Sequence, residues 1–253
     1  MQRDSSGFTL AELAIVTVIV GLLLGGLLVT LSTQLELRQN SDTQKTLEIA
    51  RDALIGFAIA NGRLPCPAVA VLAADTGVEA PSGGSTSIVP CTAPYSGYYP
   101  AVTVGLTPTD SKGYLLDSWG SRIRYAVTTA TAGVPNIFTT ANQMKTTGVS
   151  NITPTSPYLS VCNTATGMTT GPAAACASTA KLTDGAIAVI FSLGKNYATG
   201  GTGTDEAKNL DNDRAFVSHN YAPSGATNGE FDDLMVWLSP NVLYGRLAAA
   251  GAL

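Results

Sequence analysis

The chain begins with a long apolar segment whose length predicts a helix that crosses a membrane. From Phe8 to Leu31 the only charged side chain is that of Glu12. A helix needs roughly 20 apolar residues to span the hydrocarbon core of a bilayer, and this segment is longer than that. A secretory signal would have a shorter apolar core, followed by a cleavage site of small residues. We therefore expect a leader at residues 1–7 and a transmembrane helix at residues 8–31.

Beyond Leu31 the pattern becomes amphipathic, and the helix is expected to continue. No Pro or Gly occurs between Leu27 and Ile55, so no residue in this stretch breaks a helix. Apolar residues recur at helical spacing along one face, namely Leu47, Ala50, Leu54, Phe57 and Ala58. Gly62 and the prolines after it predict that the helix ends at Asn61. Residues 32–61 should lie with their apolar face against a globular head.

Three segments of the head, which we place at residues 62–253, have the pattern of β-strands. Ile123, Tyr125 and Val127 alternate with polar or small residues, as in a half-buried strand. Residues 186–193 are almost continuously apolar, which predicts a central strand, and residues 233–238 form a third candidate. We expect an α+β fold in which an antiparallel sheet packs on the amphipathic helix.

Composition and charge narrow the classes of function. Charged residues make up 13% of the 253 residues, and the formal net charge is −4. Soluble domains commonly have about 25% charged residues, so the low value favours an exported, loop-rich surface. No cluster of Lys and Arg occurs, whereas binding to nucleic-acid phosphates needs a basic stripe. Nucleic acid is therefore not expected as a partner.

The four cysteines favour disulfide bonds and an oxidising compartment. No CxxC motif occurs and the chain has one histidine, so an ordinary zinc site is not expected. Free buried thiols are the alternative to disulfides. Four cysteines allow three pairings, of which the one with the shortest loops is Cys66–Cys91 with Cys162–Cys176. The first pair would close a loop at residues 66–98, and the second an apparent insertion at residues 130–180.

Glu12 is the unusual residue of the apolar segment. A charged group at the centre of a bilayer costs about 2.5–3.5 kcal/mol on insertion scales, and less near the end of a span. The carboxylate could reach the lipid headgroups by itself. Alternatively, it pairs with a positive charge at the same depth on a neighbouring subunit.

The residues Gly7-Phe8-Thr9-Leu10-Ala11-Glu12 resemble the GFTLxE signature of type IV prepilins and type II secretion pseudopilins. The resemblance implies that a prepilin peptidase cuts between Gly7 and Phe8 on the cytoplasmic side and methylates the new amino terminus of Phe8. It also implies that Glu12 takes part in assembly. The new ammonium group would give Glu12 of a neighbour its positive partner.

The resemblance implies a structural subunit, a pseudopilin or minor pilin of a type II secretion or type IV pilus filament. Its partners would be the prepilin peptidase, membrane lipid, an inner-membrane assembly platform, and copies of itself and other pilins. It would lie in the inner membrane with its head in the periplasm, and then in the pilus or pseudopilus. Many pilins have Pro where this chain has Val29, so a major type IV pilin is the alternative. An alternative of another class is a membrane-anchored periplasmic binding domain.

The segment after the predicted central strand resembles the calcium loop of major pseudopilins. It starts with Ser192-Leu193-Gly194 and continues into a Gly-rich, acidic stretch. The resemblance implies Asn196 and Asp205 as Ca²⁺ ligands. Carboxylate and amide oxygens in a flexible loop are suitable donors for this ion. The nearby acidic stretch 211–213 (Asp211, Asn212, Asp213) is an alternative, and a solvated loop of Asx turns without a metal is another.

No pattern in the sequence predicts an enzyme. His219 follows Ser218 in a loop rather than at a strand-to-helix turn, so a catalytic triad is not expected. Asp232 and Asp233 could suggest paired carboxylates, but neighbours on a strand point to opposite faces and cannot share a substrate. We interpret them as turn residues at the end of a strand. We therefore expect a non-enzymatic protein, with Ca²⁺ as its one candidate cofactor.

Overall fold

A computed structural model of the chain describes residues 9–70, 75–86, 88–129, 135–148, 158–201 and 203–253. The side chains of residues 24–32 lie outside this description. The chain divides into two compact units, residues 1–41 and residues 42–253.

Helix α1 (Leu10–Asn61) contains 52 residues, and its part up to Ser41 belongs to the first unit. The large apolar side chains near its start, such as those of Leu10 and Leu22, are exposed. The helix ends at Asn61, as the sequence predicts. Gly62 follows with a φ of +66°, and its N–H donates to the carbonyl of Ala58 at 2.8 Å, which caps the end of the helix.

Over the residues that the structure describes, no helix combines the length and the hydropathy that a membrane span requires. The predicted span covers residues 8–31. Of these, Phe8 lies outside the described residues, and for residues 24–31 only the backbone is described.

In the second unit, the remaining part of α1 packs through the predicted apolar face. Leu47, Ala50, Leu54 and Ala58 are fully buried, and they belong to the larger of two apolar clusters in the head. The hydroxyl of Tyr99 donates to the carbonyl of Ala50 at 2.9 Å. Burial of a Leu side chain stabilises a fold by about 1.5–3 kcal/mol, so this face is sufficient to anchor the helix on the head.

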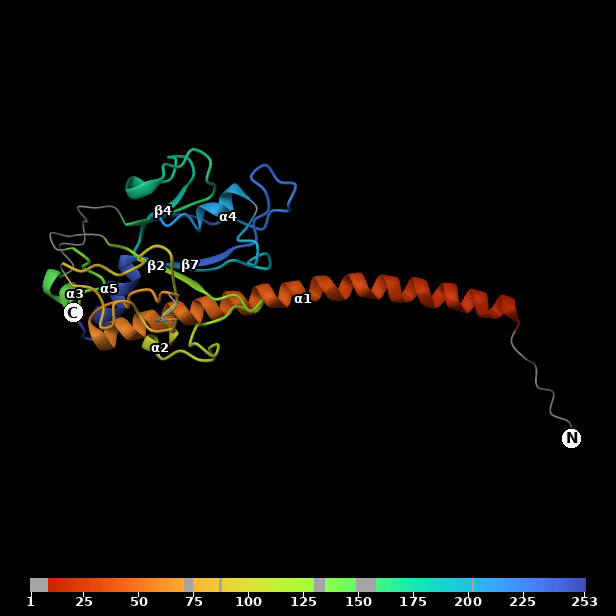
Figure 1. Ribbon diagram of the computed structural model, residues 1–253, viewed down its shortest axis with the longest axis horizontal. Coiled ribbons are helices and arrows are strands. Elements are labelled where there is room, and N and C mark those ends of the chain that lie inside the picture. The colour runs from red at the N-terminus through yellow and green to blue at the C-terminus, as the bar shows by residue number, and fades with distance from the viewer. Residues whose placement is uncertain (1–8, 71–74, 87, 130–134, 149–157, 202) are drawn as a thin grey trace, which may run out of the picture. The chain divides into compact units, whose positions relative to one another are not determined.

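The main sheet has four antiparallel strands in the order β1-β2-β5-β7. Its strands are β1 (Gly97–Tyr98), β2 (Arg124–Val127), β5 (Ala188–Ser192) and β7 (Leu234–Leu238). The last three coincide with the three predicted strands. The part of α1 after residue 41 lies along this sheet (Figure 1).

Strand β5 is apolar from Ala188 to Phe191 because both faces of the sheet are covered. Tyr125 pairs with Ile190, and Ile190 with Val236, and all three side chains belong to the cluster that includes α1. The alternate residues Val189 and Phe191 belong to a second cluster, which includes residues of a second sheet.

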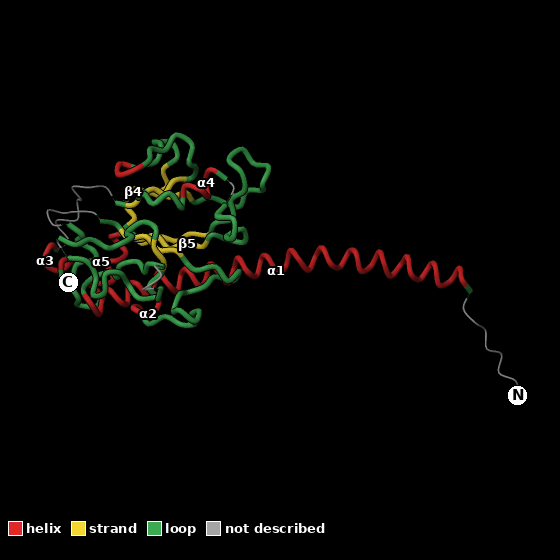
Figure 2. The backbone as a smooth tube through the Cα atoms, viewed as in Figure 1, coloured by secondary structure: helices red, strands yellow, loops and turns green. Residues whose placement is uncertain are grey.

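The second sheet corrects the expectation of a single antiparallel sheet with an insertion at residues 130–180. Figure 2 shows its strands as a separate layer over the main sheet. Strand β3 (Leu159–Cys162) is central, antiparallel to β4 (Lys181–Ala186) and parallel to β6 (Ala215–Val217). These strands have three to six residues, and β4 is largely exposed and polar, so the sequence pattern is too short and too weak to reveal them.

Short helices and covalent links complete the head. The helices are α2 (Ala101–Val104), α3 (Gln143–Thr147), η2 (Gly171–Ala173), α4 (Thr204–Lys208) and α5 (Pro240–Ala249). Disulfide bonds join Cys66 to Cys91 and Cys162 to Cys176, which is the pairing with the shortest loops. A buried ion pair between Arg63 and Glu79, at 2.6 Å, links the end of α1 to the first of these loops.

Candidate functional site

The first candidate site is the start of α1, where Thr9 and Glu12 form a capping box. The N–H and the hydroxyl of Thr9 donate to Oε2 of Glu12 at 3.0 Å and 2.9 Å, and the N–H of Glu12 donates to the Thr9 hydroxyl at 3.3 Å. This reciprocal arrangement satisfies N–H groups that the first turn of a helix leaves unpaired. Glu12 therefore has a structural role within its own chain, which was not predicted from the sequence. Gly7 and Phe8 lie outside the described residues.

The second candidate site lies in the connection between β5 and β7, where a turn at Gly194 contacts Asp232. Gly194 has a φ of +62°, and a Cβ at this position would lie 2.4 Å from Oδ1 of Asp232. Oδ2 of Asp232 accepts hydrogen bonds from the backbone N–H groups of Lys195 at 2.9 Å and Asn196 at 3.1 Å. The glycine allows the turn to wrap closely around this carboxyl group.

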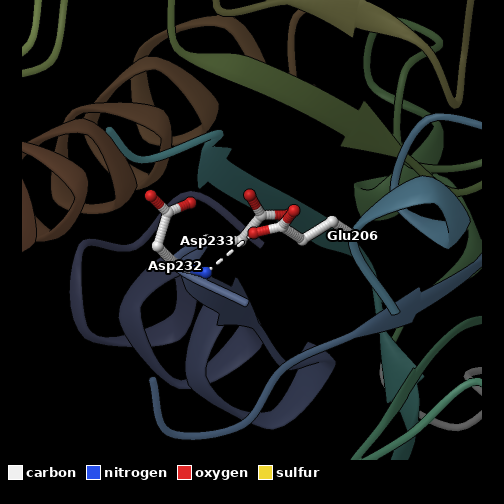
Figure 3. A group of neighbouring side chains, drawn as sticks. All are labelled: Glu206, Asp232 and Asp233. Carbon is white, nitrogen blue, oxygen red and sulfur yellow. Dashed lines mark hydrogen bonds between the residues drawn. The ribbon is translucent and has the colours of Figure 1, made fainter. Parts of the chain in front are cut away.

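Three carboxyl groups meet beside this turn, and we call Glu206, Asp232 and Asp233 the acidic cluster. Each provides one oxygen within 4.8 Å of the other two. Glu206 comes from α4, whereas the two aspartates immediately precede β7 (Figure 3). Oε1 of Glu206 accepts the backbone N–H of Asp232 at 2.8 Å, and both of its oxygens accept from Nδ2 of Asn196 at 3.0 and 3.1 Å.

The acidic cluster is poorly solvated, which makes three negative charges costly. Glu206 is 1% exposed and Asp233 is 5% exposed. Burial, followed by repulsion from Glu206, raises the pKa of Asp232 to about 6. Burial raises the pKa of Asp233 well above its usual range. A buried carboxylate normally has a cation or several hydrogen-bond donors beside it, so this cluster favours a bound cation.

The residues present fit Ca²⁺, the ion that the loop resemblance implies. Among the described buried side-chain atoms, Oδ1 of Asn196 and Oδ1 of Asp232 lack a hydrogen-bond partner. Together with Glu206 and Asp233 they form an all-oxygen donor set. Ca²⁺ prefers such donors, at six to eight per ion, and tolerates irregular geometry. Backbone carbonyls and water would complete the set.

The structure separates the two ligands that the resemblance implies. Asn196 contacts the acidic cluster, whereas Asp205 points to another part of the head. The Asp205 carboxylate accepts the backbone N–H of Ala165 at 2.6 Å, and it contacts Nδ2 of Asn228 and Nε2 of His219 at 3.1 Å each. Asp205 and Glu206 are adjacent on α4, so their side chains point about 100° apart.

The alternative ligands and the histidine are engaged elsewhere. Lys208 forms ion pairs with both Asp211 and Asp213. The His219 ring stacks on Phe231 with centroids 3.8 Å apart, and its Nδ1 lies 2.7 Å from the carbonyl oxygen of Asn220. The acidic stretch 211–213 is therefore explained by its ion pairs with Lys208, and His219 by its stacking on Phe231.

One expectation about the acidic residues was wrong. Asp232 and Asp233 lie at the end of a strand, as expected, but the expectation that their side chains could not share a site was wrong, because both reach the acidic cluster. The reason is that β7 begins at Leu234, so the pleat does not extend to these residues. Glu206 was missed because no sequence pattern shows that α4 returns to the residues before β7.

A family model matches the start of the chain. The model described as the prokaryotic N-terminal methylation motif matches residues 2–28. No curated protein and no solved structure matches the chain. The matched residues include the predicted cleavage position at Gly7 and Phe8, and the capping-box residue Glu12. The chain thus carries, at its amino terminus, the methylation motif that is the signature of type IV prepilins and pseudopilins.

Proposed function

We propose that the chain is a pseudopilin or minor pilin, a structural subunit of a type II secretion or type IV pilus filament. The methylation motif at residues 2–28, which overlaps the start of the 52-residue helix α1, is the observation that carries this proposal. The subunit would be held in the inner membrane by residues 8–31 with its head in the periplasm. An assembly platform would then move it into the filament.

Cleavage before Phe8 would prepare the chain for assembly. It creates a positive amino group at the start of α1, where the helix dipole already favours negative charge. The carboxylate of Glu12 uses Oε2 for its bonds to Thr9, and none of the described residues donates a hydrogen bond to Oε1. Oε1 can therefore accept the amino group of a neighbouring subunit without disrupting the capping box. The paired charges would then be buried together rather than singly.

The proposal is tested by the mass of the N-terminal peptide from the membrane fraction. We expect the peptide to begin at Phe8 and to carry one added methyl group. A chain that still begins at Met1, or one cut after the apolar segment, would contradict the proposal. Either result would favour the membrane-anchored periplasmic binding domain instead. Abundance in sheared filaments would separate a minor subunit or pseudopilin from a major pilin.

We further propose that the acidic cluster, together with Asn196, binds Ca²⁺ and stabilises the head. The buried oxygens without partners and the raised pKa of Asp232 support this assignment. The ion would join α4, the turn after β5 and the residues before β7. It would thereby fix the long connection between two neighbouring strands of the main sheet.

The effect of calcium should depend on pH. Without calcium, the folded head retains a proton on Asp232 between about pH 4 and about 6, where the unfolded chain has lost it. The raised pKa therefore favours the folded state at low pH, and this contribution is lost as pH rises through that window. Because calcium needs the ionised carboxylate, the rise in unfolding temperature on adding calcium should be larger at pH 7 than at pH 5. Thermal unfolding at pH 5 and at pH 7, each with and without CaCl₂, measures the rise in unfolding temperature. An equal rise at the two pH values would contradict the prediction.

A further inference from the structure

A cavity of about 270 Å³ lies on the head, beside the first residues of β2. Its lining residues come from β1, from the turn before β2, from β2 itself and from the segment after β5: Tyr98, Gly120, Ser121, Arg122, Arg124, Leu193 and Tyr197. Pockets for drug-sized ligands usually have about 300–1,000 Å³, so this cavity suits a smaller molecule. Two arginines in so small a space indicate an anion.

Arg124 carries a charge that the described part of the head does not neutralise. Its Nη1 donates to the carbonyl of Ser96 at 3.2 Å, and its guanidinium lies 4.3 Å from the centroid of the Tyr98 ring. Its buried Nε has no hydrogen-bond partner, and no carboxylate among the described residues pairs with it. A guanidinium has five N–H donors, so most of its hydrogen-bonding capacity remains available. Burial also lowers the pKa of Arg124, which agrees with a desolvated charge.

Three other cations of the described head that have little exposure to solvent are paired with acids. Arg63 contacts Glu79 at 2.6 Å, and Lys208 contacts two aspartates. Arg122, which lines the same cavity, contacts Asp110 at 3.1 Å and Asp75 at 3.2 Å. Arg124 thus differs from these three cations. Arg124 is half-buried, and an unpaired charge that is partly removed from water is costly, so an anion in the cavity would reduce a penalty as well as add a contact.

The net charge of the residues that line the cavity indicates how many negative charges the bound anion should carry. Because Arg122 is already neutralised by two aspartates, Arg124 alone supplies a net positive charge to the cavity. One positive charge matches a monoanion such as a carboxylate, and the flat guanidinium can bind both oxygens of a carboxylate at once. A phosphate dianion would need two positive charges to be neutralised, and the cavity supplies a net charge of one. Tyr197 is 40% exposed and Leu193 is buried, and together they provide an aromatic and apolar wall for the body of the ligand.

We propose that this cavity binds a small monocarboxylate, with Arg124 as the residue that recognises the carboxyl group. None of its lining residues belongs to the acidic cluster, although Leu193 and Tyr197 flank the turn at residues 194–196 that contacts this cluster. The proposed site does not depend on the assignment of the chain as a filament subunit.

The test is a calorimetric titration of the purified full-length chain with benzoate, with its neutral analogue benzamide, and with inorganic phosphate. We expect benzoate to bind at least tenfold more tightly than either of the others. A second carboxylate, acetylglutamate amide, has the side-chain carboxylate of a glutamate residue on an aliphatic chain. Comparison of its affinity with that of benzoate tests whether the cavity prefers a carboxylate with an aromatic ring or one with an aliphatic chain. Equal binding of benzoate and benzamide, or tighter binding of phosphate, would overturn the proposal.

Variants assign the effect to Arg124. Arg124→Gln should weaken benzoate binding at least tenfold, and Arg124→Lys, which keeps the charge but loses the flat pair of donors, should weaken it less. Arg246→Gln on α5 removes the same charge from an exposed position and should leave binding unchanged. Circular dichroism checks the folding of each variant. If Arg124→Gln is folded and binds benzoate as the wild type does, the proposal is wrong. Should that variant not fold, Tyr197→Ala at the exposed rim is the substitute, and unchanged binding there would count against the site.

Discussion

Replacing Glu12 with Ala is expected to abolish incorporation of the chain into filaments, while cleavage before Phe8 continues. The substitution would leave the amino group of a neighbouring subunit buried without its partner. Breaking a buried ion pair in this way costs about 3–5 kcal/mol, which corresponds to a loss of at least about a hundredfold in an association constant. The measurement is the amount of the chain in sheared filaments, relative to the amount of processed chain in the membrane.

Two further variants separate pairing from helix capping. Thr9→Val removes the two capping-box hydrogen bonds of the Thr9 hydroxyl and keeps both the backbone N–H of residue 9 and the carboxylate of Glu12, so it should cost the helix about 1 kcal/mol and leave assembly largely intact. Glu48→Ala removes an exposed glutamate from the same helix and should have no effect on assembly. If Thr9→Val abolishes assembly as completely as Glu12→Ala, the role of Glu12 is capping, and the proposed pairing is wrong.

The second large effect is expected from calcium on the stability of the head. At a calcium concentration one hundred times the dissociation constant, binding adds about 2.7 kcal/mol to the free energy of unfolding. In a domain of this size such an increment raises the unfolding temperature by roughly 5–10 °C. Asp233→Asn should remove this response, because it deletes one charged donor of the acidic cluster. Differential scanning calorimetry with calcium and with chelator measures both proteins.

The same variant has an expected effect of opposite sign without calcium. Asp233 is 5% exposed and burial raises its pKa, so replacing it with a neutral residue of the same shape should stabilise the calcium-free head. Asn retains an oxygen that can accept from Nδ2 of Asn209, which contacts Asp233 at 2.7 Å. Glu230→Gln changes an acid close in sequence but outside the acidic cluster and is the matched control. If calcium raises the unfolding temperature of the Asp233→Asn variant and of the Glu206→Gln variant as much as that of the wild type, the acidic cluster is not the calcium site.

The features that were predicted correctly have strong local signals. The end of α1 is marked by Gly62, which adopts a positive φ. The buried face of α1 follows helical spacing through Leu47 and Leu54, and β5 is a continuous apolar segment between neighbours of similar pattern. Disulfide pairing followed sequence proximity in both cases.

The features that were missed depend on contacts between distant residues or on short elements. Strand β6 has three residues and pairs in parallel with β3, so neither pattern nor turn chemistry predicts it. Helix α5 was missed although a signal was present: the Ser239 side chain accepts from the N–H of Val242, and Pro240 occupies the first turn. The acidic cluster combines α4 with the residues before β7, and this proximity results from tertiary packing alone.

The position of β5 in the middle of the main sheet has a consequence for the order in which the head can form. Its two hydrogen-bonding edges are taken by β2, which precedes it, and by β7, which follows near the end of the chain. During synthesis of the chain, β5 would emerge before β7 and expose an unpaired apolar edge, the kind of edge that promotes aggregation. Pairings between distant segments also form slowly, on a scale of milliseconds to seconds. A chaperone that shields β5 until Leu234–Leu238 have been synthesised would therefore raise the yield of the folded head.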